Sequence, residues 1–190
     1  MTKAPRLFLL PFLAMFLLVS CKSNGQGSMK NKSTSVQVKV TETRHYCGGA
    51  APSEDILQQL ATPNPKINFS LHVRPGSSND FEAKAISAMT NEQGMANFEL
   101  EAGSYCLVLD EKKDEPKAEN YQAQFLQIDT ECLPQWGQKC ELSFTVNEDG
   151  SVTPADLELK LVKRCHLNTY SPCVIWDGPI PPSAPGPSRN

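Results

Sequence analysis

Cysteine is the residue type in this sequence with the most chemistry to offer, and the chain contains seven of them. The first, Cys21, directly follows an apolar run at residues 7–19. The other six are spread along the rest of the chain at Cys47, Cys106, Cys132, Cys140, Cys165 and Cys173. An even number of cysteines in an exported chain predicts disulfides. We therefore expect three disulfides, provided that the chain leaves the cytoplasm.

The pairing of these six cysteines stays open, because six cysteines allow 15 connectivities and the sequence does not choose among them. Cys132 and Cys140 flank the short segment ECLPQWGQKC and could close it as a small loop. Cys165 and Cys173 have the same spacing in CHLNTYSPC. Of these local pairs we favour Cys132–Cys140.

Two alternative uses of the cysteines are a zinc site and a nucleophile. His45 and His166 could join cysteines around zinc, but zinc sites favour close C-x₂-C pairs and the sequence has none. Cys47 with His45 could form a nucleophilic pair, although an oxidising compartment usually consumes thiolates in disulfides. His72 shares the strand parity of polar neighbours, which predicts an exposed side chain. We predict no metal, no cofactor and no catalytic residues.

The N-terminus predicts export followed by lipidation. Lys3 and Arg6 precede the apolar run, which is the order found in secretory signal peptides. The run ends in Leu-Val-Ser-Cys21, which resembles a bacterial lipobox, so residues 1–20 would be removed and Cys21 would carry the lipid, a palmitate included. An uncleaved transmembrane helix is the alternative, but it needs about 20 apolar residues. A non-lipid cleavage site would need small residues at A-x-A positions, which are missing.

The same resemblance to bacterial lipoproteins suggests a location in the cell envelope. Lys22 follows the predicted lipidated residue, whereas an Asp there would signal retention in the inner membrane. We therefore expect the outer membrane. Acidic residues of the kind that accompany surface display do not follow Cys21, so its periplasmic face is favoured over the cell surface.

Composition divides the chain into a tether, one domain and a tail. Residues 21–34 are small and polar, as in flexible linkers, and residues 177–190 are rich in proline. Residues 35–176 have the size of a single domain with a full core. The formal net charge is −3 with no basic stripe, which argues against nucleic-acid binding.

Hydrophobic alternation predicts a β fold. Residues alternate between apolar and polar in seven to eight short segments, including 36–40, 67–73, 96–100, 105–109, 121–128, 142–146 and 157–161. Ser53 and the acidic residues after it start one short helix, SEDILQQLA. Parallel pairing would need crossover helices, so we predict an all-β, antiparallel sandwich, transthyretin-like or Ig-like, and stapled by disulfides. An eight-stranded barrel is the rival architecture. Residues 110–119 are dense in charge and predict a solvated loop.

One segment, Thr90–Leu109, carries a family resemblance. It is similar to the T-x-x-x-G-x-x-x-F-x-L-x-x-G-x-Y-x-L pattern of carboxypeptidase regulatory-like domains. The resemblance implies a transthyretin-like sandwich in which Gly94 permits a hairpin turn and Phe98 and Leu100 face the core. Such domains are typically non-catalytic, so it also implies a role in binding, spacing or stabilisation.

Aromatic residues in loops give the candidate binding surface, which comprises Tyr46, Trp136 and Tyr170. Such groups can stack on sugars or receive peptides, and they can equally cover the open end of a sandwich. We expect Trp136 to be partly exposed and Trp176 to pack on the domain. The expected partners are the membrane, through the lipid, and an envelope protein, a peptide or a glycan. The alternative function is an extracytoplasmic hydrolase with its site in the loops.

Overall fold

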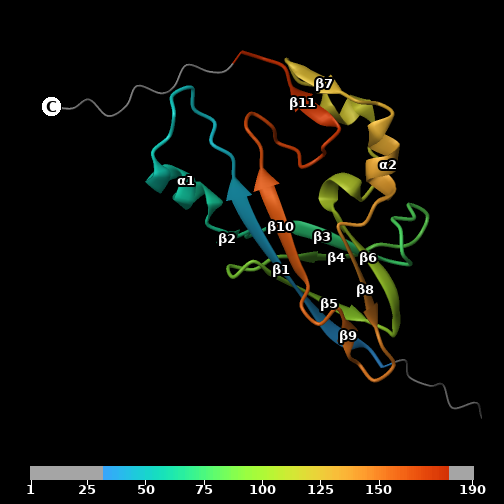
Figure 1. Ribbon diagram of the computed structural model, residues 1–190. Helices are drawn as coiled ribbons and strands as arrows, with labels where there is room; N and C mark the ends of the chain where they lie inside the picture. The colour runs from blue at the N-terminus through green and yellow to red at the C-terminus, as the bar shows by residue number, and fades with distance from the viewer. Residues whose placement is uncertain (1–31, 180–190) are drawn as a thin grey trace, which may run out of the picture. The chain divides into compact units, whose positions relative to one another are not determined.

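The computed structural model describes residues 32–179, which fold mainly into β-strands (Figure 1). The predicted signal peptide and Cys21 lie outside the described residues, as do nearly all of the predicted tether and the proline-rich tail. Two sheets pack face to face, and three disulfides link the chain. The predicted disulfide-stapled β-sandwich is therefore confirmed.

The first sheet is built around the long strand β1. Its members are β1 (Thr34–Arg44), β2 (Asn64–Pro65), β5 (Met95–Leu100) and β10 (Glu158–Lys163). One edge of β1 pairs antiparallel with β5 and then with β2, while the other edge pairs with β10. The β1–β10 pairing is parallel, which corrects the prediction of a wholly antiparallel sandwich. The chain between these strands contains the whole second sheet, so no dedicated crossover helix is needed.

The second sheet is antiparallel throughout and has the order β4-β3-β6-β8-β9. Its members are β3 (Ser70–Pro75), β4 (Ile86–Met89), β6 (Gly103–Leu109), β8 (Leu142–Val146) and β9 (Val152–Thr153). A separate two-stranded ribbon pairs β7 (Leu126–Ile128) with β11 (Val174–Trp176). The predicted strand at 121–128 is thus confined to its last three residues. The described residues hold eleven short strands, more than the seven to eight predicted.

The main core lies between the two sheets, where the alternating apolar residues meet. Val36, Val38 and Val40 of β1 are at most 1 % exposed, and they pack in one cluster with Phe98 and Leu107. Full burial of a side chain of this size contributes roughly 1.5–3 kcal/mol. The period-two pattern in the sequence therefore identified the inward faces of both sheets.

Gly94 is required where β5 begins beside β1. Its φ is +73°, in the left-handed region that favours glycine, and its carbonyl accepts a hydrogen bond of 2.8 Å from the Val40 amide. A Cβ atom at this position would lie 2.6 Å from the Val40 carbonyl oxygen. Any side chain would therefore push the turn away from β1.

A third layer covers the outer face of the second sheet, and it overturns two predictions. His72 is 3 % exposed rather than exposed, and Arg74 is 4 % exposed. The Arg74 guanidinium donates to the backbone carbonyls of Asp80 at 2.5 Å and of Lys113. The predicted solvated loop at 110–119 is partly buried too, since Lys112 is 1 % exposed. Residues between 110 and 140 fold back over the sheet and bury these polar groups.

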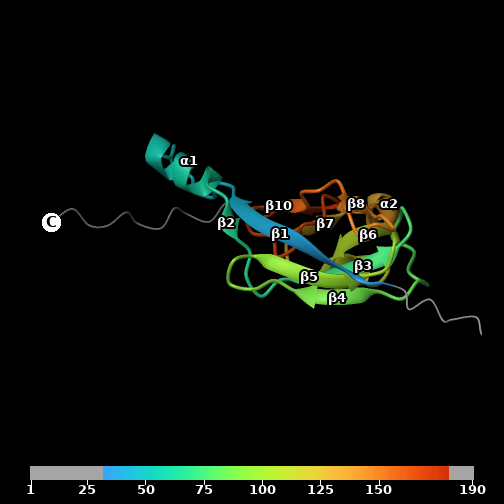
Figure 2. The same ribbon diagram turned by 90° about the horizontal axis from the view of Figure 1, so that it is seen from below.

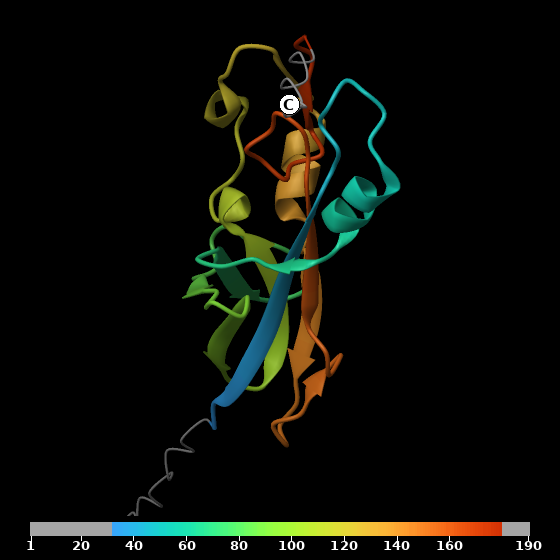
Figure 3. The ribbon, with the colours of Figure 1, turned by 90° about the vertical axis from the view of Figure 1, so that its left-hand side faces the viewer.

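The helices lie with this third layer and at one end of β1. They are α1 (Glu54–Ala61), α2 (Cys132–Gln138) and the 3₁₀ turns η1 (Asp110–Lys112) and η2 (Ala118–Tyr121). The predicted helix at 53–61 is confirmed, whereas α2 falls in a segment that the sequence predicted to be a loop. Figure 2 shows α1 projecting away from the sheets, and none of its residues is buried. In Figure 3, β1 runs toward the end where α1, α2 and β11 gather.

Candidate functional site

The segment that follows β10 organises the helical end of the molecule. We call residues 164–171 the dividing segment, because a cavity lies on each side of it. Arg164 donates to the carbonyl oxygens of Val174 at 3.1 Å and of Ser171. Glu111 accepts a hydrogen bond of 2.9 Å from the Tyr170 amide through one oxygen, and the Thr169 hydroxyl donates to the other. One half-buried cation and one carboxylate therefore fix the path of this segment.

A third charged residue, Glu42 of β1, holds the dividing segment at its other end. Its Oε1 accepts from the Tyr170 hydroxyl and from the Lys66 ammonium, each at 2.5 Å. Burial acts to raise the pKa of Glu42, but the hydrogen bonds from Lys66 and Tyr170 and the positive charge of Lys66 outweigh it, so the pKa is lowered. The Tyr170 ring also packs edge-on against Phe69, with centroids 5.8 Å apart.

One side of the dividing segment faces the acidic pocket, a cavity of about 400 Å³. We define it by three carboxylates, Asp110, Glu111 and Asp114, and by two aromatic residues, Tyr121 and Trp176. Apolar and amide side chains, with His166 and Thr169, complete the wall, and none of the lysines or arginines within residues 32–179 lines it. The volume lies within the range of small-molecule and side-chain sites.

The three carboxylates of the acidic pocket differ in the hydrogen bonds that their oxygens already accept. Both oxygens of Glu111 accept hydrogen bonds from the dividing segment. Asp110 accepts from His72 through Oδ1 at 2.8 Å. Asp114 is exposed and makes no hydrogen bond or ion pair with residues 32–179. The carboxylate of Asp114 is therefore the one most available to a ligand.

The aromatic residues of the pocket sit in a desolvated, negatively charged setting. Burial and the charge of Glu111 raise the pKa of Tyr121 to about 12. Trp176 lies 5.3 Å from His166 and 5.5 Å from Phe125, measured between ring centroids. Its indole Nε1–H is buried and finds no acceptor among the described residues. An unsatisfied buried donor costs about 1–3 kcal/mol.

Behind the pocket wall, three residues form a hydrogen-bonded line that sequence reasoning did not find. His72 Nδ1 lies 2.7 Å from Ser87 Oγ, and His72 Nε2 lies 2.8 Å from Asp110 Oδ1. His72 and Ser87 are cross-strand partners on β3 and β4, and Asp110 directly follows β6. The line has the residue types of a serine hydrolase triad. The pairing register of β3 and β4 brings His72 and Ser87 together, and no local sequence pattern predicts the line.

On the other side of the dividing segment lies the basic groove, a cavity of about 450 Å³. We define it by Arg44, His45 and Lys163 at the ends of β1 and β10 and by Ile56 and Leu60 of α1. No aspartate or glutamate lines it. The basic groove therefore has the charge opposite to that of the acidic pocket, and His166 contributes to both cavities.

The structure pairs all six described cysteines, but not as favoured from the sequence. The disulfides are Cys47–Cys165, Cys106–Cys140 and Cys132–Cys173. The favoured Cys132–Cys140 bond is wrong because α2 begins at Cys132 and holds most of the intervening residues. The seven residues of α2 rise roughly 10 Å, whereas a disulfide needs Cα atoms within about 7 Å. These pairs also leave no cysteine thiolate among the described residues to bind zinc or act as a nucleophile.

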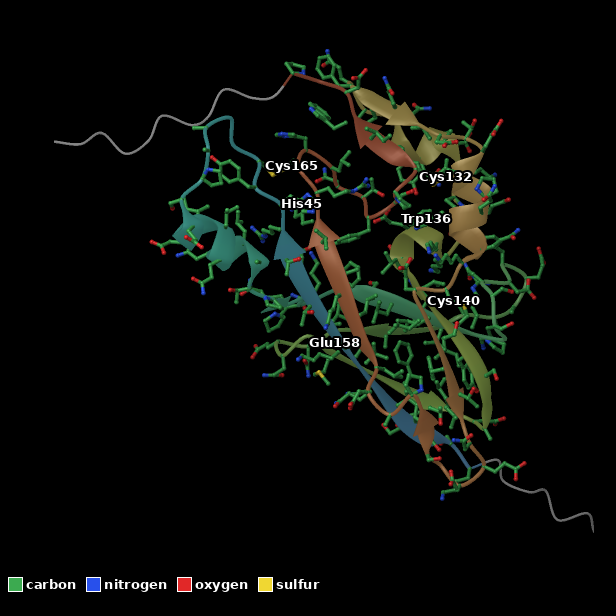
Figure 4. The ribbon with its side chains drawn as sticks, in the orientation of Figure 1. His45, Cys132, Trp136, Cys140, Glu158 and Cys165 are labelled. Atoms are coloured by element: carbon green, nitrogen blue, oxygen red, sulfur yellow. A yellow bond between two sulfur atoms is a disulfide. The ribbon has the colours of Figure 1, made fainter. Side chains whose placement is uncertain are left out.

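The three predicted surface aromatics do not form one site. Trp136 is 8 % exposed, which contradicts the expected partial exposure, because α2 turns it inward over the Lys112 ammonium at 4.6 Å from its ring. Tyr46 is half-buried beside the basic groove, and Tyr170 is tied to Glu42. Figure 4 shows Trp136 on α2, while His45 and Cys165 lie at the ends of β1 and β10. Trp176 is half-buried and lines the acidic pocket, whereas Trp136 and Tyr170 line a separate cavity of about 510 Å³.

Comparison with protein-family models, with curated proteins and with solved structures finds no match to this chain. No helix within residues 32–179 has the length and apolar character needed to cross a membrane. Across the same residues, no group of three or more His, Cys, Asp or Glu side chains is arranged to hold a metal ion. The candidate site therefore rests on the geometry and charge of the acidic pocket.

Proposed function

We propose that this chain is an envelope-anchored lipoprotein whose β-sandwich is a non-catalytic binding module, with the acidic pocket as its binding site. The observation that carries the proposal is a cavity lined by convergent carboxylate, amide and aromatic side chains. Such a combination of apolar walls and a few placed polar groups is typical of ligand sites. The bacterial lipobox at Cys21 supports the anchor, with the outer membrane and its periplasmic face as the proposed location.

The course of β1 supports a module held away from its anchor. The proposed tether leads into Thr34, the first residue of β1, and the basic groove and dividing segment lie at the far end of the strand. Eleven extended residues span roughly 35 Å. A lipid attached through Cys21 would thus join the module at the end of β1 opposite to the basic groove and the dividing segment.

The consecutive strands β5 and β6, which lie in different sheets, support the proposed kinship with carboxypeptidase regulatory-like domains. Phe98, Leu100 and Leu107 are each at most 2 % exposed, and Gly94 has the positive φ that its turn needs. These are the positions at which the resemblance requires core and turn residues. Non-catalytic binding is the role that such a kinship implies.

Two measurements on intact cells test this proposal. We expect metabolic labelling with palmitate to modify the full chain and the label to disappear in Cys21→Ala. We expect cross-linking in the native envelope to capture a partner, and the bulky substitution Ala123→Trp in the pocket wall to abolish that capture. Glu148→Gln, in the exposed turn at 147–150, is the matched control that should keep it. An unlabelled chain in the soluble cytosol would refute the anchor, and capture that survives Ala123→Trp would refute the site.

The second candidate function is an extracytoplasmic hydrolase, which the Ser87–His72–Asp110 line favours. Asp110 would hold the proton on His72 Nε2, leaving Nδ1 to accept the proton of the Ser87 hydroxyl. It ranks second because the Asp110 side chain is 66 % exposed, so water weakens its hold on an imidazolium. A fluorophosphonate probe would label Ser87 and spare Ser87→Ala if this function held. We expect no labelling of either protein.

A further inference from the structure

We propose that the acidic pocket binds the cationic side chain, arginine or lysine, of an extended peptide segment in a partner protein. This inference rests on the binding function proposed above and names the chemistry of its ligand.

The charge of the pocket selects a cation. Asp110, Glu111 and Asp114 line it, and no lysine or arginine does. A site with one sign of charge and low-dielectric walls concentrates ligands of the opposite sign. A neutral sugar could donate hydrogen bonds to the carboxylates but would leave their negative charge unbalanced, and an anion would be repelled.

The free oxygens fix where the cation would bind. Asp114 has no partner among the described residues, and Asp110 uses Oδ1 for His72. Glu111 already accepts two hydrogen bonds, so it contributes charge rather than direct contact. Asp114 is therefore expected to make the main ion pair, and a guanidinium would also stack favourably on the aromatic wall.

The surface beside the pocket indicates a peptide rather than a small polyamine. The β7–β11 ribbon contributes Leu126 and Trp176 to the pocket wall, and Phe125, whose ring packs on Trp176, is 43 % exposed. Apolar side chains next to a basic one in a peptide could cover these residues, whereas a polyamine could not. A two-stranded ribbon also offers edges to which an extended peptide can add.

Titration calorimetry on the full chain in detergent micelles tests the proposal. The probe is acetyl-Ile-Arg-Ile-Arg-Ile-amide, and its counterpart has citrulline at both arginine positions, which keeps the shape and removes the charge. We expect the arginine peptide to bind and the citrulline peptide to bind at least about tenfold more weakly, a difference of about 1.4 kcal/mol. Asp114→Asn should weaken the arginine peptide by a similar factor, and Glu148→Gln should not.

The outcomes separate this inference from the function on which it rests. Equal binding of the arginine and citrulline peptides would overturn the cationic ligand while leaving the pocket as a binding site. Binding of spermidine as tight as that of the arginine peptide would overturn the peptide class. Absence of any arginine-peptide binding would overturn the inference outright, whereas the Ala123→Trp cross-linking experiment judges the pocket itself.

Discussion

The acidic pocket and the basic groove lie on opposite sides of one segment, yet their walls are held in different ways. The wall of the acidic pocket includes the buried Leu167, and it adjoins a disulfide that anchors α2. The basic groove is lined directly by the Cys47–Cys165 disulfide and by α1, in which no residue is buried. Buried side chains hold part of the wall of the acidic pocket, which lowers the ordering cost of binding there. One wall of the basic groove is instead a helix without buried side chains.

The strongest test of this difference between the two cavities removes one disulfide from each side of the dividing segment. Replacing Cys132 and Cys173 by alanine opens a loop with a sequence separation of 41, and Cys47 with Cys165 opens one of 118. Loop entropy gives losses of about 4 and 5 kcal/mol in the free energy of unfolding. We expect the first double variant alone to lose arginine-peptide binding. Denaturant unfolding and calorimetry on both variants measure this, and loss of binding in the second would contradict it.

The two helices provide the next contrast. Trp136 of α2 is buried with Leu133 and Cys173, so Trp136→Ala should lower the free energy of unfolding by about 4 kcal/mol. Leu57 of α1 is 48 % exposed, and Leu57→Ala should change the free energy of unfolding by about 0.5 kcal/mol or less. The urea concentrations at which the two variants and the unchanged chain are half unfolded test this prediction. Similar losses would mean that α1 is packed as firmly as α2.

Glu42 gives a pH-dependent test of how the dividing segment is anchored. Because its pKa is lowered in the folded chain, its contribution to stability is complete above its ordinary pKa of 4.5 and disappears as the pH falls through the lowered value. Glu42→Gln should cost about 2 kcal/mol at pH 7 and make stability fall less steeply between pH 5 and 3. Urea unfolding across this range measures the slope. An unchanged acid slope would show that Glu42 is not the titrating anchor.

The smallest expected effect is a change in one titration. Burial and Glu111 raise the pKa of Tyr121 to about 12, so Glu111→Gln should lower it while burial keeps it above its ordinary value of 10. Ultraviolet difference titration follows the phenolate, and Tyr121→Phe assigns the signal among the four tyrosines. A Tyr121 titration that does not move would place the Glu111 charge farther from the phenol than the structure has it.

Much of the fold could be predicted from alternation, because one buried face leaves a period-two pattern. Val36 to Val40 and Phe98 to Leu100 show it, and both strands form. The parallel β1–β10 pairing could not be predicted, since its partners are distant in sequence. Helix α2 was missed because it is short and contains Pro134 and Gly137.

The candidate site was beyond sequence reasoning for a related reason. The apolar–polar alternation of its strand predicted an exposed His72 on the outer face of the sheet. Alternation carries no information on whether a later segment of the chain covers that face. The unbroken apolar run Tyr105–Leu109 was a usable signal, because a strand buried on both faces reads that way. The carboxylates of the acidic pocket lie in a segment whose charge suggests exposure. Only the fold brings that segment against the one that follows β10.

The connectivity of the disulfides bears on how this chain reaches its folded state. No native bond joins two cysteines that are consecutive in the sequence. If the chain is exported as proposed, oxidation of the cysteines in the order in which they emerge would join Cys47 to Cys106 and Cys132 to Cys140, and neither of these bonds is native. Thiol–disulfide exchange must then undo them. We expect a catalyst of disulfide shuffling, rather than an oxidant alone, to set the yield of correctly folded protein.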